Sequence, residues 1–305
     1  MKLYYRISDK SYEKQKLIGT NKEVCFMNFC KAFAPVIFDS LVNPPDESST
    51  NLFEPPVKVF CDNCDRKTTK MVDSSGLPYS VSAEGNAGSL RLAIKTALEE
   101  CNDNELVYFC EDDYLHKESA PVLLEEGIKR ADYVTLYDHP DKYTRFYNGG
   151  EFSKVIKTAS SHWRYTASTC MTFGCKVKTL REDEEIWMDD ELTGEKIPHD
   201  HHIFKKLAEA NNRRVAVCIP GVACHVDLTF SDKVNYMLME TWAVDMMIEH
   251  LEKELDEITE CSRKYVEYTD LRDNMLQDKV GLEKLMALDA LRMHLLQNGY
   301  RKGEL

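Results

Sequence analysis

The sequence contains no run of about 18 consecutive apolar residues, the length that a helix needs to cross a bilayer. Its first residues, Met1 to Arg6, lack the apolar segment of a signal peptide. It also has no repeat of fixed period and no low-complexity tract, which argues against a solenoid or a fibrous array. We therefore expect a cytoplasmic protein without a membrane span.

The eleven cysteines lack the dense, short-range spacing of a disulfide-rich secreted domain. Cys61 and Cys64 form one CxxC pair, but the spacing of Cys218 and Cys224 does not supply the second pair of a zinc site. We therefore interpret the cysteines mainly as free thiols in a reducing compartment.

The formal net charge is −13, from 39 basic and 52 acidic residues, and it opposes binding to polyanions such as DNA. A chain of 305 residues with 43% hydrophobic content can bury a substantial core. Composition therefore predicts a globular protein with one large domain, or one domain and an accessory piece.

Strand and helix patterns alternate along the first 230 residues. The continuous apolar run 106–110 indicates a buried strand, and it follows a helical pattern at 89–101. The same alternation continues in the patterns at 3–7, 24–38, 57–61, 133–137, 201–210 and 215–219. It predicts an α/β fold whose mostly parallel sheet is flanked by helices.

Beyond residue 231 the strand patterns disappear, and apolar residues recur at the four- and three-residue steps of a helical face. We therefore divide the chain into a catalytic domain at 1–230 and a helical C-terminal subdomain at 231–305. The C-terminal helices either form a hairpin that packs on the catalytic domain or make the contact of a homodimer.

Three consecutive acids, Glu111, Asp112 and Asp113, follow the buried strand 106–110. Ligands bind at the carboxyl ends of strands in open α/β sheets, and Mg²⁺ or Mn²⁺ takes carboxylate oxygens together with substrate phosphates. A solvated turn or a helix N-terminus is the structural alternative for such a triplet. The position of the triplet predicts a metal site.

With this triplet, the chain resembles nucleotide-sugar glycosyltransferases of the GT-A fold, closest to the family 2 type, over about residues 1–228. In that family an early strand ends in an acid that binds the nucleotide, which would be Asp62. A glycine-containing turn then opens a helix, as at 84–91, where Asn86 and Arg91 would contact the nucleotide sugar. Simple capping of the helix is the alternative for this turn.

The resemblance also implies a metal site formed by Glu111, Asp113 and His225, holding Mn²⁺ or Mg²⁺. The triplet departs from the common DXD motif because glutamate takes the first place. Asp112, which we assign to the nucleotide sugar, is then also available as a metal ligand. A bound divalent cation would stabilise the charge that builds on the diphosphate leaving group.

Inverting members of the family carry a catalytic base just before a helix, and Asp200 is the matching residue. A base must lie within hydrogen-bond reach of the acceptor hydroxyl and take its proton. Asp189, Asp190 and Glu191 compete for this role, and a charged loop is their structural alternative.

Aromatic and hydroxyl residues in the segment 160–169 suit recognition of a sugar, so we assign His162 and Trp163, with Asp189 and Asp190, to the acceptor. The same segment also fits a buried strand with satisfied hydroxyls. We expect a glycan or a small molecule as acceptor, and the net charge makes a modified DNA base less favoured.

Two other functions compete with sugar transfer. A nucleotidyltransferase shares the sheet and the acidic metal site, but it typically has a glycine-rich, basic loop after the first strand, and the residues after Ile7 lack those glycines. A non-catalytic scaffold that works through its C-terminal helices has no need of metal-dependent nucleotide binding. Nucleotide binding therefore separates the enzymes from the scaffold.

Overall fold

The computed structural model describes residues 1–10, 20–42, 55–143, 153–193 and 198–226. Most of the described residues belong to one compact unit, formed by Met1–Glu13 and Lys22–His225 within those limits. The predicted C-terminal subdomain and its dimer contact lie outside the described residues. No described helix has both the length and the apolar character that crossing a membrane requires.

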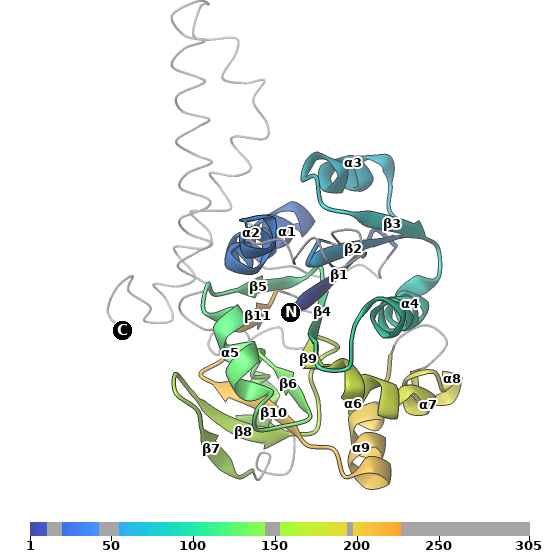
Figure 1. Cartoon of the computed structure of the whole chain (residues 1–305). Coiled ribbons are helices and arrows are strands. Elements are labelled where there is room, and N and C mark those ends of the chain that lie inside the picture. The colour runs from blue at the N-terminus through green and yellow to red at the C-terminus, as the bar shows by residue number, and fades with distance from the viewer. Residues whose placement is uncertain (11–19, 43–54, 144–152, 194–197, 227–305) are drawn as a thin grey trace, which may run out of the picture. The chain divides into compact units, whose positions relative to one another are not determined.

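The centre of the unit is a nine-stranded sheet in the order β3-β2-β1-β4-β9-β6-β10-β8-β7 (Figure 1). Strands β8 and β9 run opposite to the other seven. The bounds are β1 Lys2–Ser8, β2 Val57–Asp62, β3 Tyr79–Ser82, β4 Leu106–Glu111, β6 Tyr133–Thr135, β7 Val155–Lys157, β8 His162–Thr166, β9 Phe173–Lys176 and β10 Val215–Ile219. The predicted α/β fold, with a mostly parallel sheet flanked by helices, is therefore confirmed.

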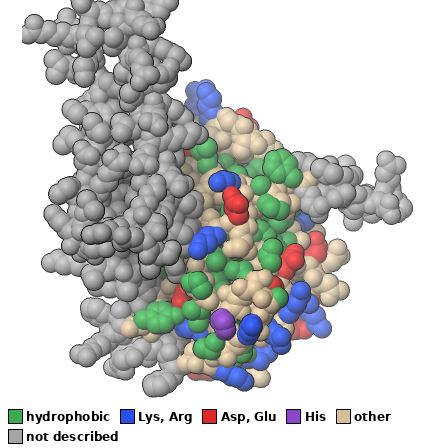
Figure 2. All heavy atoms as spheres, turned by 90° about the vertical axis from the view of Figure 1, so that its left-hand side faces the viewer, with side chains coloured by type: hydrophobic (Ala, Val, Ile, Leu, Met, Phe, Trp, Pro, Cys, Tyr) green, Lys and Arg blue, Asp and Glu red, His purple; other side chains and the backbone are tan. Residues whose placement is uncertain are grey.

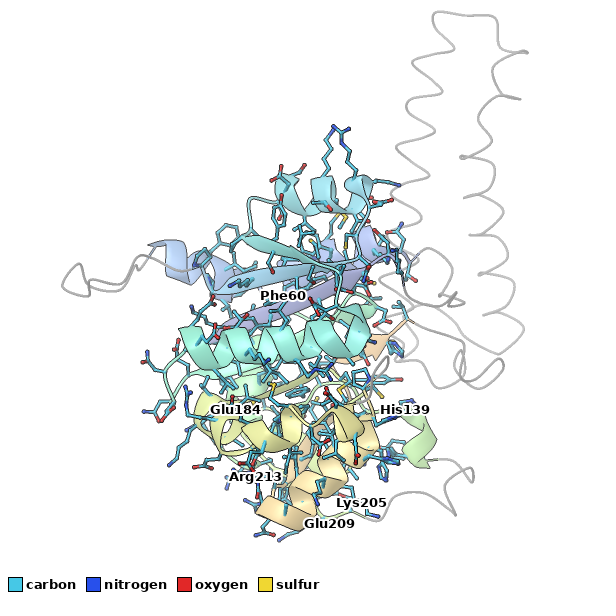
Figure 3. All side chains as sticks on the ribbon, turned by 90° about the vertical axis from the view of Figure 1, so that its right-hand side faces the viewer. Phe60, His139, Glu184, Lys205, Glu209 and Arg213 are labelled. Atoms are coloured by element: carbon cyan, nitrogen blue, oxygen red, sulfur yellow. The ribbon has the colours of Figure 1, made fainter. Side chains whose placement is uncertain are left out.

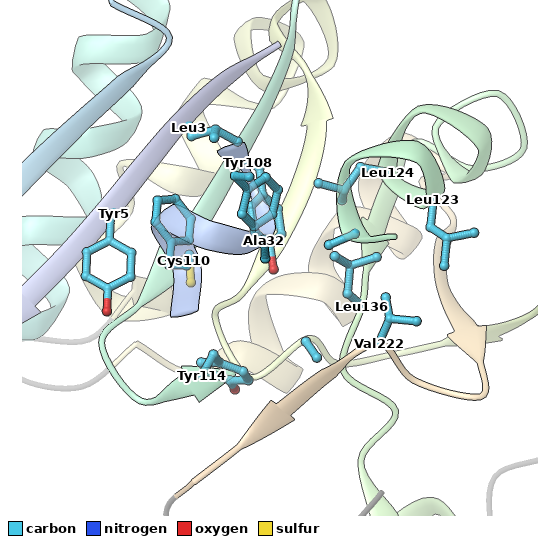
Figure 4. Packing of buried hydrophobic residues seen from close by; sticks show 14 of the residues in the cluster. Leu3, Tyr5, Ala32, Tyr108, Cys110, Tyr114, Leu123, Leu124, Leu136 and Val222 are labelled. Atoms are coloured by element: carbon cyan, nitrogen blue, oxygen red, sulfur yellow. The ribbon is translucent and has the colours of Figure 1, made fainter. Parts of the chain in front are cut away.

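Successive side chains of a strand point to opposite faces of the sheet. Apolar side chains therefore lie on both faces of this sheet, and helices cover both faces. Leu3 and Tyr5 of β1 pack in the apolar cluster of one face of the sheet (Figure 4), to which Ile7 also belongs. Tyr4 packs in the cluster of the other face. The helices of the first face are α1 Lys22–Ala32, α2 Ala34–Val42, α3 Arg66–Ser74 and α5 Ala120–Gly127. Those of the second are α4 Gly85–Glu100, α6 Val177–Glu182, α7 Glu184–Trp187 and α9 Asp200–Asn211, and Figure 3 views this side.

The helix expected at 24–38 is two helices, α1 and α2, which meet at Phe33. Pro35 lies in the first turn of α2, where the missing backbone N–H of proline costs no helical hydrogen bond. The same residue inside a continuous helix would break the hydrogen-bond ladder. Pro35 therefore explains where the single predicted helix divides.

Short elements complete the unit. A second sheet pairs β5 (Tyr114–His116) with β11 (Ala223–His225), and α8 (Asp190–Thr193) and the 3-10 helix η1 (Pro140–Tyr143) lie in loops. On the face shown in Figure 2, hydrophobic side chains are exposed among charged side chains of both signs.

The apolar patterns at 133–137 and 215–219 correspond to β6 and β10, and the helical pattern at 201–210 corresponds to α9.

The segment 160–169 contains β8, and its tryptophan is part of the core. Trp163 is fully buried, and its ring lies so close to Gly127 that a Cβ at that glycine would meet a ring atom at 2.4 Å. The indole nitrogen of Trp163 donates to Thr158 Oγ1 at 3.0 Å. The assignment of Trp163 to the acceptor is therefore corrected, because its ring is enclosed by apolar side chains. His162, the other residue of this segment assigned to the acceptor, is exposed.

Candidate functional site

Polar side chains gather where the parallel strands β3, β2, β1 and β4 end side by side. In the register of these strands, Ser8 lies opposite Asp62, and Arg6 lies opposite Glu111. The carboxyl ends of adjacent parallel strands meet at one edge of a sheet, and that edge is where α/β proteins bind ligands. Asp62 and Glu111, two of the predicted site residues, therefore lie on the edge that the fold makes available.

Each acid of the triplet has a basic side chain beside it. Arg6 Nη2 lies 2.5 Å from Glu111 Oε1, and Lys22 Nζ lies 3.8 Å from Asp112 Oδ2. His225 Nε2 lies 3.2 Å from Asp113 Oδ2. Like charges on adjacent residues disfavour one another's ionised form, and a nearby cation relieves that effect. Arg6 and Lys22 thus bring positive charge to Glu111 and Asp112, and Asp113 has the imidazole of His225 as its neighbour.

The contact between Asp113 and His225 depends on the small second sheet. Antiparallel pairing of β5 with β11 places Tyr114 opposite His225, so His225 reaches the acid that precedes β5. The Tyr114 and His225 rings stack, with centroids 4.8 Å apart. The rings of Tyr137 and His139 extend this aromatic group beside the site. Asp113 and His225, more than 100 positions apart in the sequence, are therefore held within hydrogen-bonding distance.

Asp62 is fully buried and accepts four hydrogen bonds. Its Oδ1 accepts from Ser82 Oγ at 2.9 Å and from the Glu84 amide at 2.7 Å. Its Oδ2 accepts from the Gly85 amide at 3.1 Å and from Asn63 Nδ2 at 2.8 Å. Gly85 has a φ of +77°, which suits glycine and opens α4 directly after this turn. Asp62 thus holds the loop before α4, and its contact with a nucleotide stays a prediction.

The two predicted nucleotide residues of α4 point to different neighbours. The side-chain oxygen and the carbonyl of Asn86 accept from Arg6 Nη1 at 3.0 and 2.9 Å. Arg91 Nη1 donates to Thr193 Oγ1 at 2.6 Å and lies 3.1 Å from Asp190 Oδ1. The structure therefore brings Asn86 to Arg6, which pairs with Glu111, and brings Arg91 together with a predicted acceptor residue.

Asp200 holds a turn between β8 and β9. Its Oδ2 accepts from the Thr169 amide at 2.8 Å, and its Oδ1 accepts from Thr169 Oγ1 at 2.8 Å and from the Met171 amide at 3.2 Å. Burial raises the pKa of the Asp200 carboxyl, although these hydrogen bonds act in the opposite direction. A carboxyl whose pKa is raised toward neutrality is better suited to take a proton.

The turn that Asp200 holds connects it to the triplet. Cys170 and Met171 both have positive φ, 50° and 56°, which is uncommon for residues with side chains. The Tyr114 hydroxyl donates to the Cys170 carbonyl at 3.1 Å. Tyr114 directly follows Asp113, so one turn is fixed both by the candidate base and by the residue next to the candidate metal ligand.

Asp189, predicted for the acceptor, caps a short helix instead of facing the triplet residues. Its Oδ1 accepts from the amides of Glu191 and Leu192 at 2.8 and 3.3 Å. The helix α8 that follows packs against α9. Asp189 thus has a structural role at the start of α8, and its acceptor contact stays a prediction.

Sequence reasoning missed Arg6, Lys22 and Tyr114 as parts of the site. A charged residue inside the apolar strand pattern at 3–7 was the available signal for Arg6. Lys22 gave no such signal, because its contacts with Asp9 and Asp112 depend on the path of the chain after β1. A buried pair outside the triplet was missed as well: Asp138 Oδ1 lies 2.6 Å from Arg164 Nη2 at the end of β6.

Within the described residues, no group of three or more His, Cys, Asp or Glu side chains is arranged to hold a metal ion. Glu111 faces Arg6, whereas Asp113 and His225 already lie within 3.2 Å of each other. One carboxylate and one imidazole suit a cation whose remaining ligands come from substrate phosphates and water. The residues present therefore fit a two-residue metal site better than the predicted three-residue site.

No family model and no curated protein sequence matches this chain. Among solved structures, S. aureus TarS 1–349 has 16% identity and a TM-score of 0.35, with 71% of this chain and 58% of that chain covered. The chain thus spans less than two thirds of that structure, which has also been solved with UDP. CMP:2-keto-3-deoxy-manno-octonic acid synthetase, solved with CTP, has 11% identity and a TM-score of 0.41, with 78% and 98% covered.

A third similar structure is the nucleoside-diphosphate-sugar pyrophosphorylase from Vibrio cholerae RC9. It has 9% identity and a TM-score of 0.39, with 70% of this chain and 90% of that chain covered. At these scores none of the three structures assigns a reaction to this chain, so the choice of reaction depends on its own residues.

We expect Asp62→Asn to lower the free energy of unfolding by about 1–3 kcal/mol. The NH2 group of asparagine would face buried donors whose hydrogen bonds a carboxylate oxygen accepts in the parent. Urea denaturation would measure the change. Asp65→Asn is the matched control, since Asp65 is exposed and caps α3 through one oxygen that asparagine retains. Equal stability of the two variants would contradict a structural role for Asp62.

Proposed function

We propose that this protein is a metal-dependent glycosyltransferase that moves a sugar from a nucleotide-diphosphate sugar to an acceptor hydroxyl. The observation that carries the proposal is the Asp113–His225 contact at the carboxyl edge of the parallel strands, joined through Tyr114 and the Cys170 turn to Asp200. A metal-binding pair and a carboxylate of raised pKa are the two parts that inverting sugar transfer requires.

Asp113 and His225 would hold Mg²⁺ or Mn²⁺, with Asp112 close by. When bound, the cation supplies positive charge to the diphosphate leaving group. Lys22 lies beside Asp112 at the end of β1, where it adds a positive charge to the same edge. The pairing of Glu111 with Arg6 makes Glu111 a less favoured ligand than the sequence implies.

Asp200 would act as the general base. The carboxylate takes the proton of the acceptor hydroxyl as that oxygen attacks the anomeric carbon, and the bond from this carbon to the diphosphate breaks. The anomeric configuration is therefore inverted. Because burial raises the pKa of Asp200, turnover should fall as the pH is lowered and this group becomes protonated. We propose a glycan or small-molecule acceptor on this side of the site.

The discriminating experiment compares the products of two reactions. We expect the protein with Mn²⁺ to release a nucleoside diphosphate from at least one nucleotide sugar of a UDP-, GDP-, CMP- and dTDP-sugar panel. For a CMP-sugar the released product is CMP. Incubation with nucleoside triphosphates and sugar 1-phosphates is the matched arm. Release of pyrophosphate in that arm, with no nucleotide release from the sugar panel, would instead establish a nucleotidyltransferase.

We expect Asp113→Asn to abolish the part of nucleoside-diphosphate binding that depends on the divalent cation, because an amide replaces the carboxylate that would bind it. Calorimetric titrations with Mn²⁺ and with a chelator would measure this difference. Asp103→Asn, at an exposed carboxylate on Arg181, is the control. Unchanged affinity and unchanged metal dependence in Asp113→Asn would remove the metal site from the proposal.

We expect Asp200→Asn to retain donor binding while turnover falls by about 10²-fold or more, the scale of a positioned base. Thr169→Val controls for loosening of the turn, because it removes one hydrogen bond to Asp200 and leaves the carboxylate in place. Near-parental turnover in a folded, donor-binding Asp200→Asn protein would refute the base assignment and favour Asp189, Asp190 or Glu191.

A further inference from the structure

Arg6 lies in β1, a strand whose neighbouring buried side chains are apolar or aromatic. Its side chain is only 4% exposed. Removing a guanidinium from water costs free energy unless hydrogen bonds and an opposite charge compensate, and a well-packed apolar residue would often be at least as stable in its place. The buried charge of Arg6 therefore calls for an explanation beyond the stability of the sheet.

The two terminal nitrogens of Arg6 bind two different elements. Nη1 donates to the carbonyl and side-chain oxygens of Asn86 and to Ser89 Oγ, at 2.9, 3.0 and 3.1 Å, all in the first turns of α4. Nη2 donates to Glu111, at the end of β4. Arg6 is thus a rigid connection between the start of α4 and the acid triplet.

We propose that Arg6 is a positioning residue that sets the first turn of α4 relative to the acid triplet. Its effect on nucleotide binding rests on the proposed function, whereas its effect on α4 does not. Asp62 already accepts from the amides of Glu84 and Gly85, and the first turn of α4 has further backbone amides, which favour anions. The triplet carries the candidate metal ligand Asp113. A diphosphate that reaches both features requires a fixed separation between them.

The chemistry of arginine suits this role. A planar guanidinium presents donors in fixed directions, so one side chain can bind a helix and a carboxylate at the same time. The compact ammonium of lysine would compensate the charge of Glu111 without fixing the direction of α4. The competing explanation is that Arg6 only neutralises Glu111. It predicts that removing both charges together leaves the first turn of α4 as it is in the parent.

The experiment uses Arg6→Met/Glu111→Gln, which removes the two charges together, with Arg6→Lys as the conservative variant. The control is Arg181→Met/Asp103→Asn, because Arg181 pairs with Asp103 and donates to the Leu98 carbonyl near the other end of α4. Amide hydrogen exchange without nucleotide is measured over residues 86–90, and urea denaturation reports global stability.

We expect exchange over 86–90 to be about tenfold faster or more in Arg6→Met/Glu111→Gln than in the parent and in the control, at similar global stability. Arg6→Lys should show the same loss of protection, because its charge is kept while its geometry is not. Parental protection in both Arg6 variants would overturn the proposal. If the double variant unfolds globally, Arg6→Lys, which retains the charge, decides the question. Faster exchange in Arg6→Lys supports the proposal, and parental protection overturns it.

Titration with UDP, GDP and CDP in the presence of Mn²⁺ then tests the consequence for binding. We expect weaker binding in both Arg6 variants than in the control, for each nucleotide that the parent binds. Faster exchange with unchanged affinity would overturn the link from α4 to the ligand. If the parent binds no nucleotide, the proposed function fails, while the exchange measurement still decides whether Arg6 positions α4.

Discussion

Three carboxylates on consecutive residues repel one another, and this repulsion constrains everything built around the end of β4. Arg6 of β1 and Lys22 of α1 place positive charge beside Glu111 and Asp112, and His225 of β11 contacts Asp113. Compensating charges in a partly buried place must be close, so each contact also fixes the position of the element that supplies it. The contacts of the triplet thus join the first strand, the first helix and the last described strand.

Much of the fold follows from local patterns in the sequence. The apolar runs that became β1, β2, β4 and β10 are strongly hydrophobic because both faces of these strands are covered by helices. The edge strand β3 escaped prediction for the opposite reason, whereas β5 and β11 are largely buried but only three residues long. Residues of β3 alternate between exposed and half-buried positions, so no apolar run marks them. Strand β9 was missed because its antiparallel placement depends on partners far along the chain.

The candidate site was predictable in its residue types and less so in its contacts. Asp113 and His225 were identified separately, and the structure brings them together through the pairing of β5 with β11. Arg6 and Glu111 show the limit of the same reasoning, because the motif identifies the acids but not the arginine that pairs with one of them. Trp163 shows another limit, since an aromatic residue suits a sugar surface and a core equally well until packing is known.

Strand β9 has a consequence for how the protein is made. Its residues 173–176 fill the space between β4 and β6, to which they pair on either side. A ribosome releases β4 and β6 well before β9, so the centre of the sheet has two open strand edges during this part of synthesis. Open edges can pair with other chains, and pairings between distant segments form slowly. The edges of β4 and β6 that face β9 therefore stay open to mispairing until residue 176 emerges, and the edge of β6 that faces β10 stays open until residue 219 emerges.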